Sequence, residues 1–251
     1  MASSVARTYL SVRDVAALVE VAALDADRAE LLRRCRVATE LGAATLLCRP
    51  EDVPTAVCAL GGSGVVVGTT VGAEEAGHDE LLAEAARACD AGARQVALPV
   101  SGADLGRGGI ESLAGLVRAV AAVAAPAELK VGLPGGSVPV ADLQRAAATA
   151  SAAGALIVSV GLWSGGDRAR LASIRPIRQA LGPDKLLKWT HRVTSLDRLL
   201  LAHSEGADLF NADLEVICAE ARGRVQNGGI RVPVPGVDYI PGRGPETLRA
   251  S

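Results

Sequence analysis

Lysine and aromatic side chains are scarce in this chain of 251 residues. Trp, Tyr and Phe make up 2% of the residues, which argues against the aromatic platforms on which single-stranded nucleic acid stacks. Only three of the 26 basic residues are lysines, so arginine carries most of the positive charge. The formal net charge of -2 provides no general attraction to nucleic acid or to anionic membranes. These absences favour a small-molecule partner.

Long apolar runs and paired cysteines are also missing. No apolar run reaches the ~18 residues of a membrane span, and the first 14 residues lack the apolar core of a signal peptide. The five cysteines are odd in number and form no C-x-x-C pair, which is typical of free thiols in a reducing compartment. We therefore expect a cytoplasmic protein that does not contact membranes.

Short apolar segments alternate with helical segments along the chain. Four Gly-Ala dipeptides, which begin at Gly42, Gly92, Gly154 and Gly206, lie between a predicted helix and the strand after it. The predicted strands are 15–24, 44–48, 64–71, 94–100, 128–133, 155–161, 185–190 and 208–211. The predicted helices are 28–41, 50–60, 76–91, 110–124, 140–152, 167–181, 194–205 and 213–223.

Strands that alternate with helices of this length form parallel, right-handed units, and eight such units close into a barrel. We therefore predict an α/β fold, a (β/α)8 TIM barrel, as a single domain over residues 1–223. An open doubly wound sheet is the alternative, but it usually has fewer strands, and no G-x-G-x-x-G follows the first strand. Residues 224–251 form a Pro/Gly-rich C-terminal tail that either folds over the barrel or stays without fixed structure.

Lys188 lies inside the predicted strand 185–190, in the run Leu186-Leu-Lys-Trp-Thr-His-Arg192. A buried ammonium group is costly unless another group pairs with it or a reaction uses it. Lys130 also falls in an apolar run, Glu128-Leu-Lys-Val-Gly-Leu133. Both lysines are therefore candidates for chemistry.

Several segments lie in the order and spacing of one known family, over about residues 18–215. They are LLRRCRVATELGAATLLCRP (31–50), Gly68-Thr-Thr-Val71 with Glu84-Ala85, Leu129-Lys-Val131, Gly154-Ala155 and Leu187-Lys188. Together they resemble the deoxyribose-phosphate aldolases, and they imply a TIM barrel that cleaves or forms C–C bonds through a lysine imine.

The chain departs from that family at the positions that matter for catalysis. Where the family has its imine-forming lysine on the sixth barrel strand, this chain has Ser159, and where it has a catalytic aspartate on the fourth strand, this chain has Ala97. The Gly-Gly of strand seven is replaced by Thr190-His191, and the serine-rich phosphate loop by Asn211-Ala-Asp213. Asp213 would repel a phosphate, so we expect a substrate that need not be phosphorylated.

Candidate site residues gather at the carboxyl ends of the strands, where TIM barrels bind their substrates. The expected substrate-binding residues are Thr70, Trp163, Ser164, Gly165, Thr190, Arg192, Asn211 and Asp213. The expected catalytic residues are Lys188, Lys130, His191, Glu20 and Ser159.

A lysine attacks a carbonyl only when it is neutral, so burial and a second ammonium must lower its pKa from ~10.4. Strands five and seven contribute to the same side-chain layer of a TIM barrel, so Lys130 can lie beside Lys188. The hypothesis is that Lys188 forms the imine and His191 or Glu20 moves protons. In the structural alternative, the Lys188 ammonium pairs with Glu20 or Asp213 and stabilises the barrel.

The leading hypothesis is a lyase of the class I aldolase type that acts on a small carbonyl substrate without a cofactor. No spacing of His, Asp or Glu indicates a metal site. One alternative is an imine-free cyclase or isomerase that uses Ser159, His191 and Asp213, and another is a non-catalytic barrel that binds a metabolite. No nucleic-acid or membrane partner is expected, and a homodimer is left open.

Overall fold

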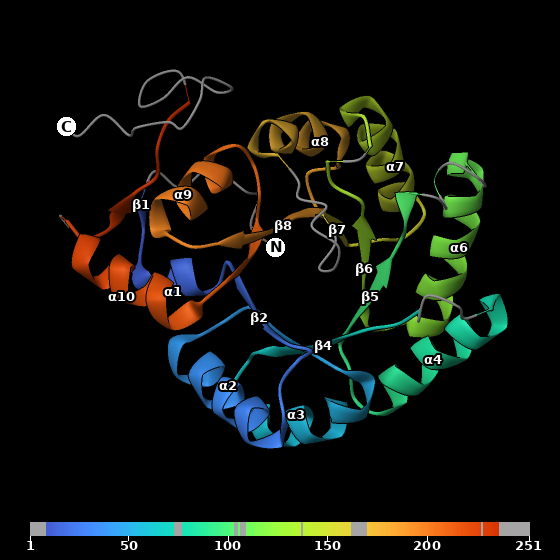
Figure 1. Cartoon of the computed structure of the whole chain (residues 1–251), viewed down its shortest axis with the longest axis horizontal. Coiled ribbons are helices and arrows are strands. Elements are labelled where there is room, and N and C mark those ends of the chain that lie inside the picture. The colour runs from blue at the N-terminus through green and yellow to red at the C-terminus, as the bar shows by residue number, and fades with distance from the viewer. Residues whose placement is uncertain are drawn as a thin grey trace.

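The structure, a computed structural model, describes residues 9–72, 77–102, 105, 109–136, 138–161, 170–226 and 228–235, apart from the side chains of Glu111 and Arg192. Eight parallel strands close into a barrel in chain order, β2 to β9, and β9 pairs with β2. Helices surround the strands on all sides (Figure 1). The predicted (β/α)8 TIM barrel is confirmed.

The barrel strands carry the inner wall, and one helix or helical segment follows each of them. The strands are β2 (Val19–Ala23), β3 (Thr45–Cys48), β4 (Val66–Thr70), β5 (Gln95–Pro99), β6 (Glu128–Leu133), β7 (Ile157–Val160), β8 (Leu186–Val193) and β9 (Leu209–Ala212). The helices are α2 (Arg28–Leu41), α3 (Val53–Leu60), α4 (His78–Asp90), α6 (Gly109–Ala124), α7 (Val140–Ala152), α8 (Ile174–Ala180), α9 (Leu196–Ser204) and α10 (Leu214–Arg224).

Local sequence signals begin and end these helices. The Asp27 side chain accepts a hydrogen bond from the Glu30 N–H at 2.9 Å and so caps α2. The helix ends at Gly42, whose φ of 82° is a left-handed conformation that glycine adopts without strain. The glycines of the other three Gly-Ala pairs also have positive φ. The repeated dipeptide is therefore a repeated turn between helix and strand.

The predicted strand 15–24 is wrong at its start. Residues Val12–Ala16 form a short helix, α1, and the strand begins only at Val19. The cause is a capping box: the Ser11 side chain accepts from the Asp14 N–H at 3.1 Å, and Asp14 accepts from the Ser11 N–H at 2.9 Å. This pair starts a helix in a segment that is apolar enough to resemble a strand.

The first part of the predicted tail contacts the opposite end of the chain. Strand β10 (Ile230–Arg231) pairs antiparallel with β1 (Tyr9–Leu10), and both lie beside α1 and α10 in Figure 1. Ile230 and Val232 are buried. The segment around β10 is thus held against β1 at its buried residues, whereas 227 and 236–251 lie outside the described residues.

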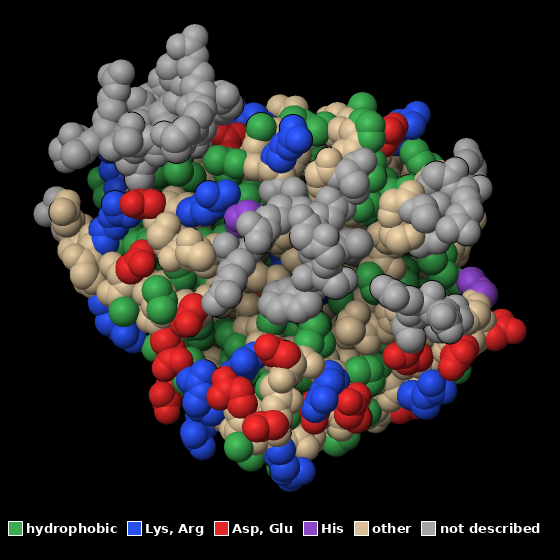
Figure 2. Space-filling model, viewed as in Figure 1, with side chains coloured by type: hydrophobic (Ala, Val, Ile, Leu, Met, Phe, Trp, Pro, Cys, Tyr) green, Lys and Arg blue, Asp and Glu red, His purple; other side chains and the backbone are tan. Residues whose placement is uncertain are grey.

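Small and branched side chains form the core between strands and helices, as the composition predicts. Trp189 and Phe210 are the largest of the fully buried side chains, and most of the others are Ala, Val or Leu. No helix in the described part of the chain is long and apolar enough to cross a membrane. Acidic and basic side chains mix over α2, α3 and α4 on the face that Figure 2 shows.

Candidate active site

Inward-facing side chains fill the barrel in layers, each built from alternate strands. Glu20, Lys130 and Lys188 meet although their strands are not neighbours, so they point into the barrel. Alternation along each strand and the pairing register then place the other inward residues. Four layers follow one another from the amino to the carboxyl ends of the strands. The floor layer comes first (Thr45, Gln95, Ile157, Leu209), and the lysine layer lies above it (Glu20, Gly68, Lys130, Lys188). The serine layer comes next (Leu47, Ala97, Ser159, Asn211), and the mouth layer is last (Ala22, Thr70, Gly132, Thr190).

One carboxylate is shared by two ammonium groups in the lysine layer. Glu20 accepts a hydrogen bond from Lys130 Nζ at 2.5 Å and another from Lys188 Nζ. All three side chains are at most 4% exposed. Lys130 Nζ also donates to Oε1 of Gln95 at 2.9 Å, in the floor layer. The cluster is therefore a buried group with two positive charges and one negative charge.

Burial and charge shift the pKa values of this cluster. Burial lowers the pKa of Lys188 from 10.5 to about 8, because the ammonium loses solvation; Lys130 acts in the same direction and Glu20 against it. Burial by itself would raise the pKa of Glu20, but the two ammonium groups outweigh it and lower that pKa to about 2. At pH 7, Glu20 is thus ionised, and Lys188 gives up its proton more readily than an exposed lysine does.

A pair of hydroxyl groups lies on the mouth side of Lys188. Ser159 is the register partner of Lys188 on the neighbouring strand, and its Oγ shares a hydrogen bond with Oγ1 of Thr190. Both residues are buried. The pairing of β8 with β9 shifts between Trp189 and Arg192, a bulge that adds residues at the carboxyl end of β8. Ser159 and Thr190 are therefore the polar groups that a ligand in contact with Lys188 would meet next.

His191 stacks on Trp189, with ring centroids 4.9 Å apart and 10° between the planes. The guanidinium of Arg198, on α9, lies 5.4 Å from the centroid of the Trp189 ring. Trp189 follows the inward Lys188, so it faces the helices, and the stack holds the His191 ring on that outer side of β8. His191 is thus turned away from Lys188.

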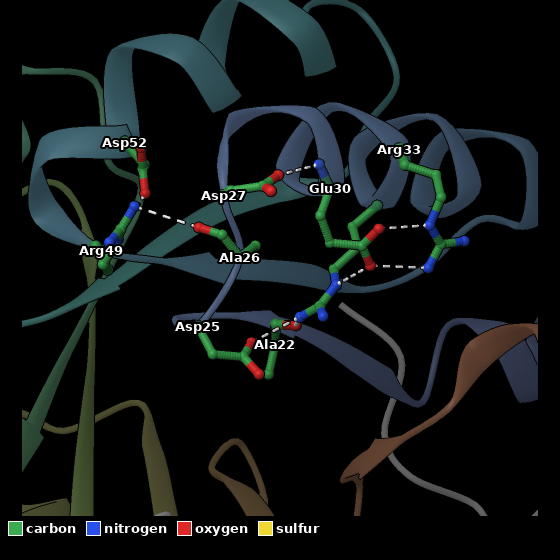
Figure 3. A network of polar contacts seen from close by, with 9 residues as sticks. Ala22, Asp25, Ala26, Asp27, Glu30, Arg33, Arg49 and Asp52 are labelled. Carbon is green, nitrogen blue, oxygen red and sulfur yellow. Dashed lines mark hydrogen bonds and ion pairs between the residues drawn. The ribbon is translucent and has the colours of Figure 1, made fainter.

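Charged side chains also fix the loop between β2 and α2 at the mouth of the barrel (Figure 3). Arg34 Nη1 donates to the Ala22 carbonyl oxygen at 2.5 Å and to Asp25 at 3.0 Å. Arg49 donates to Asp52 at 2.9 Å and to the Ala26 carbonyl oxygen at 3.3 Å. Arg49, although it lies at a strand end, is thus engaged by this loop and its own helix.

Comparisons of the sequence with protein-family models and with curated proteins find no match. Solved structures do match. A protein from Coccidioides immitis, provisionally named a deoxyribose-phosphate aldolase, is 24% identical with a TM-score of 0.78, over 85% of this chain and 88% of that chain. The deoxyribose phosphate aldolase of Aeropyrum pernix is 18% identical with a TM-score of 0.71, over 86% and 94%. The aldolase QR15 is 15% identical with a TM-score of 0.74, over 88% and 97%.

The fold is that of the deoxyribose-phosphate aldolases. The family that the sequence resembles is thus also the family whose solved structures are similar to this one. Within this aldolase fold, the structure brings Glu20, Lys130 and Lys188 together, as the sequence predicts. Of the two carboxylates considered as partners of Lys188, it is Glu20 that makes the contact.

The predicted substrate-binding residues do not all lie together. Thr190 and Asn211 face the barrel, and Thr70 lies in the mouth layer, where its hydroxyl donates to the Ala97 carbonyl oxygen at 3.3 Å. Asp213 is exposed and caps α10, because its side chain accepts from the Val216 N–H at 3.1 Å. It is not part of the lysine layer.

Four predicted substrate-binding residues lie wholly or partly outside the described residues. Trp163, Ser164 and Gly165 fall in 162–169, which the structure does not describe. Arg192 is described only by its backbone, which pairs with Asn211. The described part of the chain contains no group of three or more His, Cys, Asp or Glu side chains that could hold a metal ion.

Two residues that shape the site were not predicted from the sequence. Gln95 accepts the second hydrogen bond of Lys130, and a polar residue inside the predicted strand 94–100 was the available signal. Gly68 is the fourth member of the lysine layer and leaves its place without a side chain. A Cβ there would lie 3.2 Å from Thr45 Cγ2 and 3.4 Å from Gln95 Oε1. A side chain at position 68 would therefore crowd Gln95, the second acceptor of Lys130.

Proposed function

We propose that the chain is a lyase of the aldolase type, which forms or breaks a C–C bond in a small carbonyl substrate through an imine on Lys188. The observation that carries the proposal is the buried lysine layer, where Lys188 has a pKa of about 8 and shares Glu20 with Lys130. A lysine with a pKa near neutrality is nucleophilic under physiological conditions. Solved aldolases with the same fold support this reading.

The contacts favour Lys188 over Lys130 as the nucleophile. Lys130 Nζ donates to both Glu20 and Gln95, so it keeps two acceptors when Lys188 leaves. Glu20 likewise keeps Lys130 as a partner. Release of Lys188 therefore leaves a neutral, hydrogen-bonded pair of Glu20 and Lys130 and exposes neither charge. Lys130 then has the role of lowering the pKa of its neighbour.

The reaction begins when the neutral Nζ of Lys188 attacks the carbonyl carbon of the substrate. The carbonyl oxygen takes up two protons and leaves as water, and an iminium forms. In cleavage, the hydroxyl group on the carbon β to the iminium carbon loses its proton, and the β-carbon leaves as a second carbonyl compound. The electron pair of the broken C–C bond neutralises the iminium, which becomes an enamine. The enamine takes up a proton at carbon, and water hydrolyses the resulting iminium to free the lysine. In the opposite direction the enamine forms that bond.

Protons for these steps come from groups that the lysine layer and the layers above it provide. The hydroxyl pair of Ser159 and Thr190 lies on the mouth side of Lys188 and is suited to donate to the leaving oxygen. Glu20, with its pKa of about 2, stays ionised and stabilises the positive charge of the iminium. His191 faces the helices and is given no role in proton transfer.

Reductive trapping tests the imine directly. Wild-type protein is incubated with a panel of small aldehydes and ketones, reduced with borohydride, and analysed by intact mass and peptide mapping. We expect an adduct on Lys188 that is absent in Lys188→Met. This variant leaves Glu20 paired with Lys130, so it introduces no unpaired buried charge.

Lys185→Met is the matched control, because Lys185 is the third lysine of the chain and precedes the same strand. It should retain the adduct on Lys188. Adducts only on other amines, or full turnover by Lys188→Met, would contradict the imine. In that case the imine-free cyclase or isomerase becomes the better candidate, with Ser159 and Thr190 as its acid–base groups.

A further inference from the structure

Asn211 provides a buried acceptor close to the lysine layer. It is 4% exposed, lies in the serine layer, and is the register partner of Glu20 on the neighbouring strand. Its Oδ1 is buried and has no hydrogen-bond donor among the described residues. Ser159, in the same layer, differs because its hydroxyl is bonded to Thr190. Asn211 Oδ1 is thus an acceptor without a donor among the described residues, on the strand next to the only carboxylate of the cluster.

Buried polar atoms in folded proteins nearly always have a partner, because an unsatisfied acceptor loses the hydrogen bond that water gave it. An acceptor without one in a substrate site is therefore best explained by a donor on the ligand. The serine layer separates the mouth layer from the lysine layer. A substrate that reaches Lys188 from the mouth must pass Asn211.

The charges around Asn211 indicate which donor it receives. The lysine layer already carries two ammonium groups against one carboxylate, so a cationic donor is repelled. An ionised phosphate or carboxylate oxygen has no hydrogen to offer Oδ1. A neutral hydroxyl group carries no positive charge and has a hydrogen to donate, so it is the donor that fits Asn211 Oδ1.

We propose that Asn211 is a specificity-determining residue that accepts a hydrogen bond from a hydroxyl group of the carbonyl substrate. The position of the carbonyl beside Lys188 rests on the proposed function above. A substrate without the hydroxyl leaves Oδ1 unpaired in the complex, so the site selects hydroxyaldehydes or hydroxyketones over their deoxy counterparts. We expect about 10-fold to 100-fold in affinity, the range for one unpaired buried acceptor.

Matched ligand pairs test the role of Asn211 without any reductant. The pairs are hydroxyacetone with acetone, glycolaldehyde with acetaldehyde, and 4-hydroxy-2-butanone with 2-butanone, which moves the hydroxyl one carbon further away. Dissociation constants are measured by ligand-observed NMR on wild type, Asn211→Ala, Asn211→Asp and Thr45→Val. Thr45 is the control because it is the other register partner of Glu20 and lies on the floor side.

Wild type and Thr45→Val should prefer the hydroxylated member of at least one pair about 10-fold or more. Asn211→Ala should reduce that ratio to near one by weakening only the hydroxylated ligand, whereas Asn211→Asp, which keeps an acceptor oxygen, should retain a preference. Equal affinities in wild type for all three pairs would overturn the proposal, and so would an unchanged ratio in Asn211→Ala.

Two further readouts separate hydroxyl recognition by Asn211 from imine formation and from a purely structural role. Borohydride trapping of the same ligands reports on Lys188 alone, so a hydroxyl preference without an adduct refutes the imine and keeps the Asn211 site. Thermal unfolding of Asn211→Ala reports on stability. Because the substitution removes no described hydrogen bond of Oδ1, the melting temperature should stay close to that of wild type, and a large fall would favour the structural role.

Discussion

Glu20→Gln is the sharpest perturbation of the lysine layer, because it removes the only negative charge and preserves the shape of the side chain. Wild-type Glu20 accepts hydrogen bonds from both Lys130 and Lys188 while it is 1% exposed. The glutamine can still accept through Oε1 from one ammonium, but its amide N–H₂ then faces the other. Two buried positive charges remain without a counter-ion.

The expected loss of stability is large. Removal of one partner from a buried ion pair typically costs about 3–5 kcal/mol. The pKa of Glu20 supports this size independently, since a carboxyl whose pKa falls from 4.5 to about 2 is stabilised in its ionised form by about 3 kcal/mol on folding. Domains of this kind are stable by only about 5–15 kcal/mol in total. The variant should therefore fold, but with a strongly reduced unfolding midpoint.

Urea denaturation followed by circular dichroism measures the effect, with Glu30→Gln on α2 as the matched control. Glu30 also accepts from two cations, Arg33 at 2.8 Å and Arg34 at 2.7 Å, and its pKa is also lowered to about 2. Its side chain is 32% exposed, however, so water screens the charges and the substitution should have little effect. If Glu20→Gln lowers stability no more than Glu30→Gln, our account of the buried cluster is refuted.

Two further predictions concern pH and the turns between helices and strands. Glu20 has a lowered pKa in the fold, so its contribution of about 3 kcal/mol to stability is complete above pH 4.5 and is lost as the pH falls toward 2. The difference in unfolding free energy between wild type and Glu20→Gln, measured by urea titration, should therefore vanish over that interval. A difference that stays constant with pH would contradict this prediction. Gly206→Ala should lower the free energy of unfolding by about 1–3 kcal/mol, because φ is 109° and the new Cβ would lie 2.6 Å from Arg178 Cγ. Gly115→Ala is the control, since no atom outside the backbone of α6 lies within 4 Å of the new Cβ, and it should be neutral or stabilising. Equal melting temperatures for these two glycine variants would count against the strained turn.

The fold could be predicted because its signals are local. Helices such as α2 (14 residues) and α6 (16 residues) are long enough to show their period, and glycine marks the turn before a strand at four places. At α1, however, the local apolar pattern predicted a strand where a helix forms. Residues 15–24 have an apolar pattern that suits a strand, but the hydrogen bonds between Ser11 and Asp14 begin a helix just before it. Two capping residues thus determined the local structure here, although the ten residues of the apolar run predicted a strand.

The part of the candidate site that could be predicted is the pair of lysines, Lys130 and Lys188, because a charged side chain inside an apolar strand is unusual. Glu20 was one of two carboxylates expected as a partner of Lys188, and its contact with Lys130 was not predicted. The direction of His191 was not predictable, because the bulge in β8 and the stack on Trp189 determine which side of the strand its ring occupies. The open acceptor of Asn211 depends on the pairing register of β9 with β2, which no local pattern encodes.

The departure at Ser159 fits the charge balance of the cluster. The family that the sequence resembles has a lysine at this position, in the layer directly above Lys188. A third ammonium here would give the cluster three positive charges against the single Glu20 carboxylate. With serine in its place, the layer above Lys188 holds a short hydroxyl that is bonded to Thr190, and only two ammonium groups compete for Glu20. One of them, Lys130, has Gln95 as a second acceptor, so under the proposed function Lys188 is the amine that leaves Glu20 and reacts.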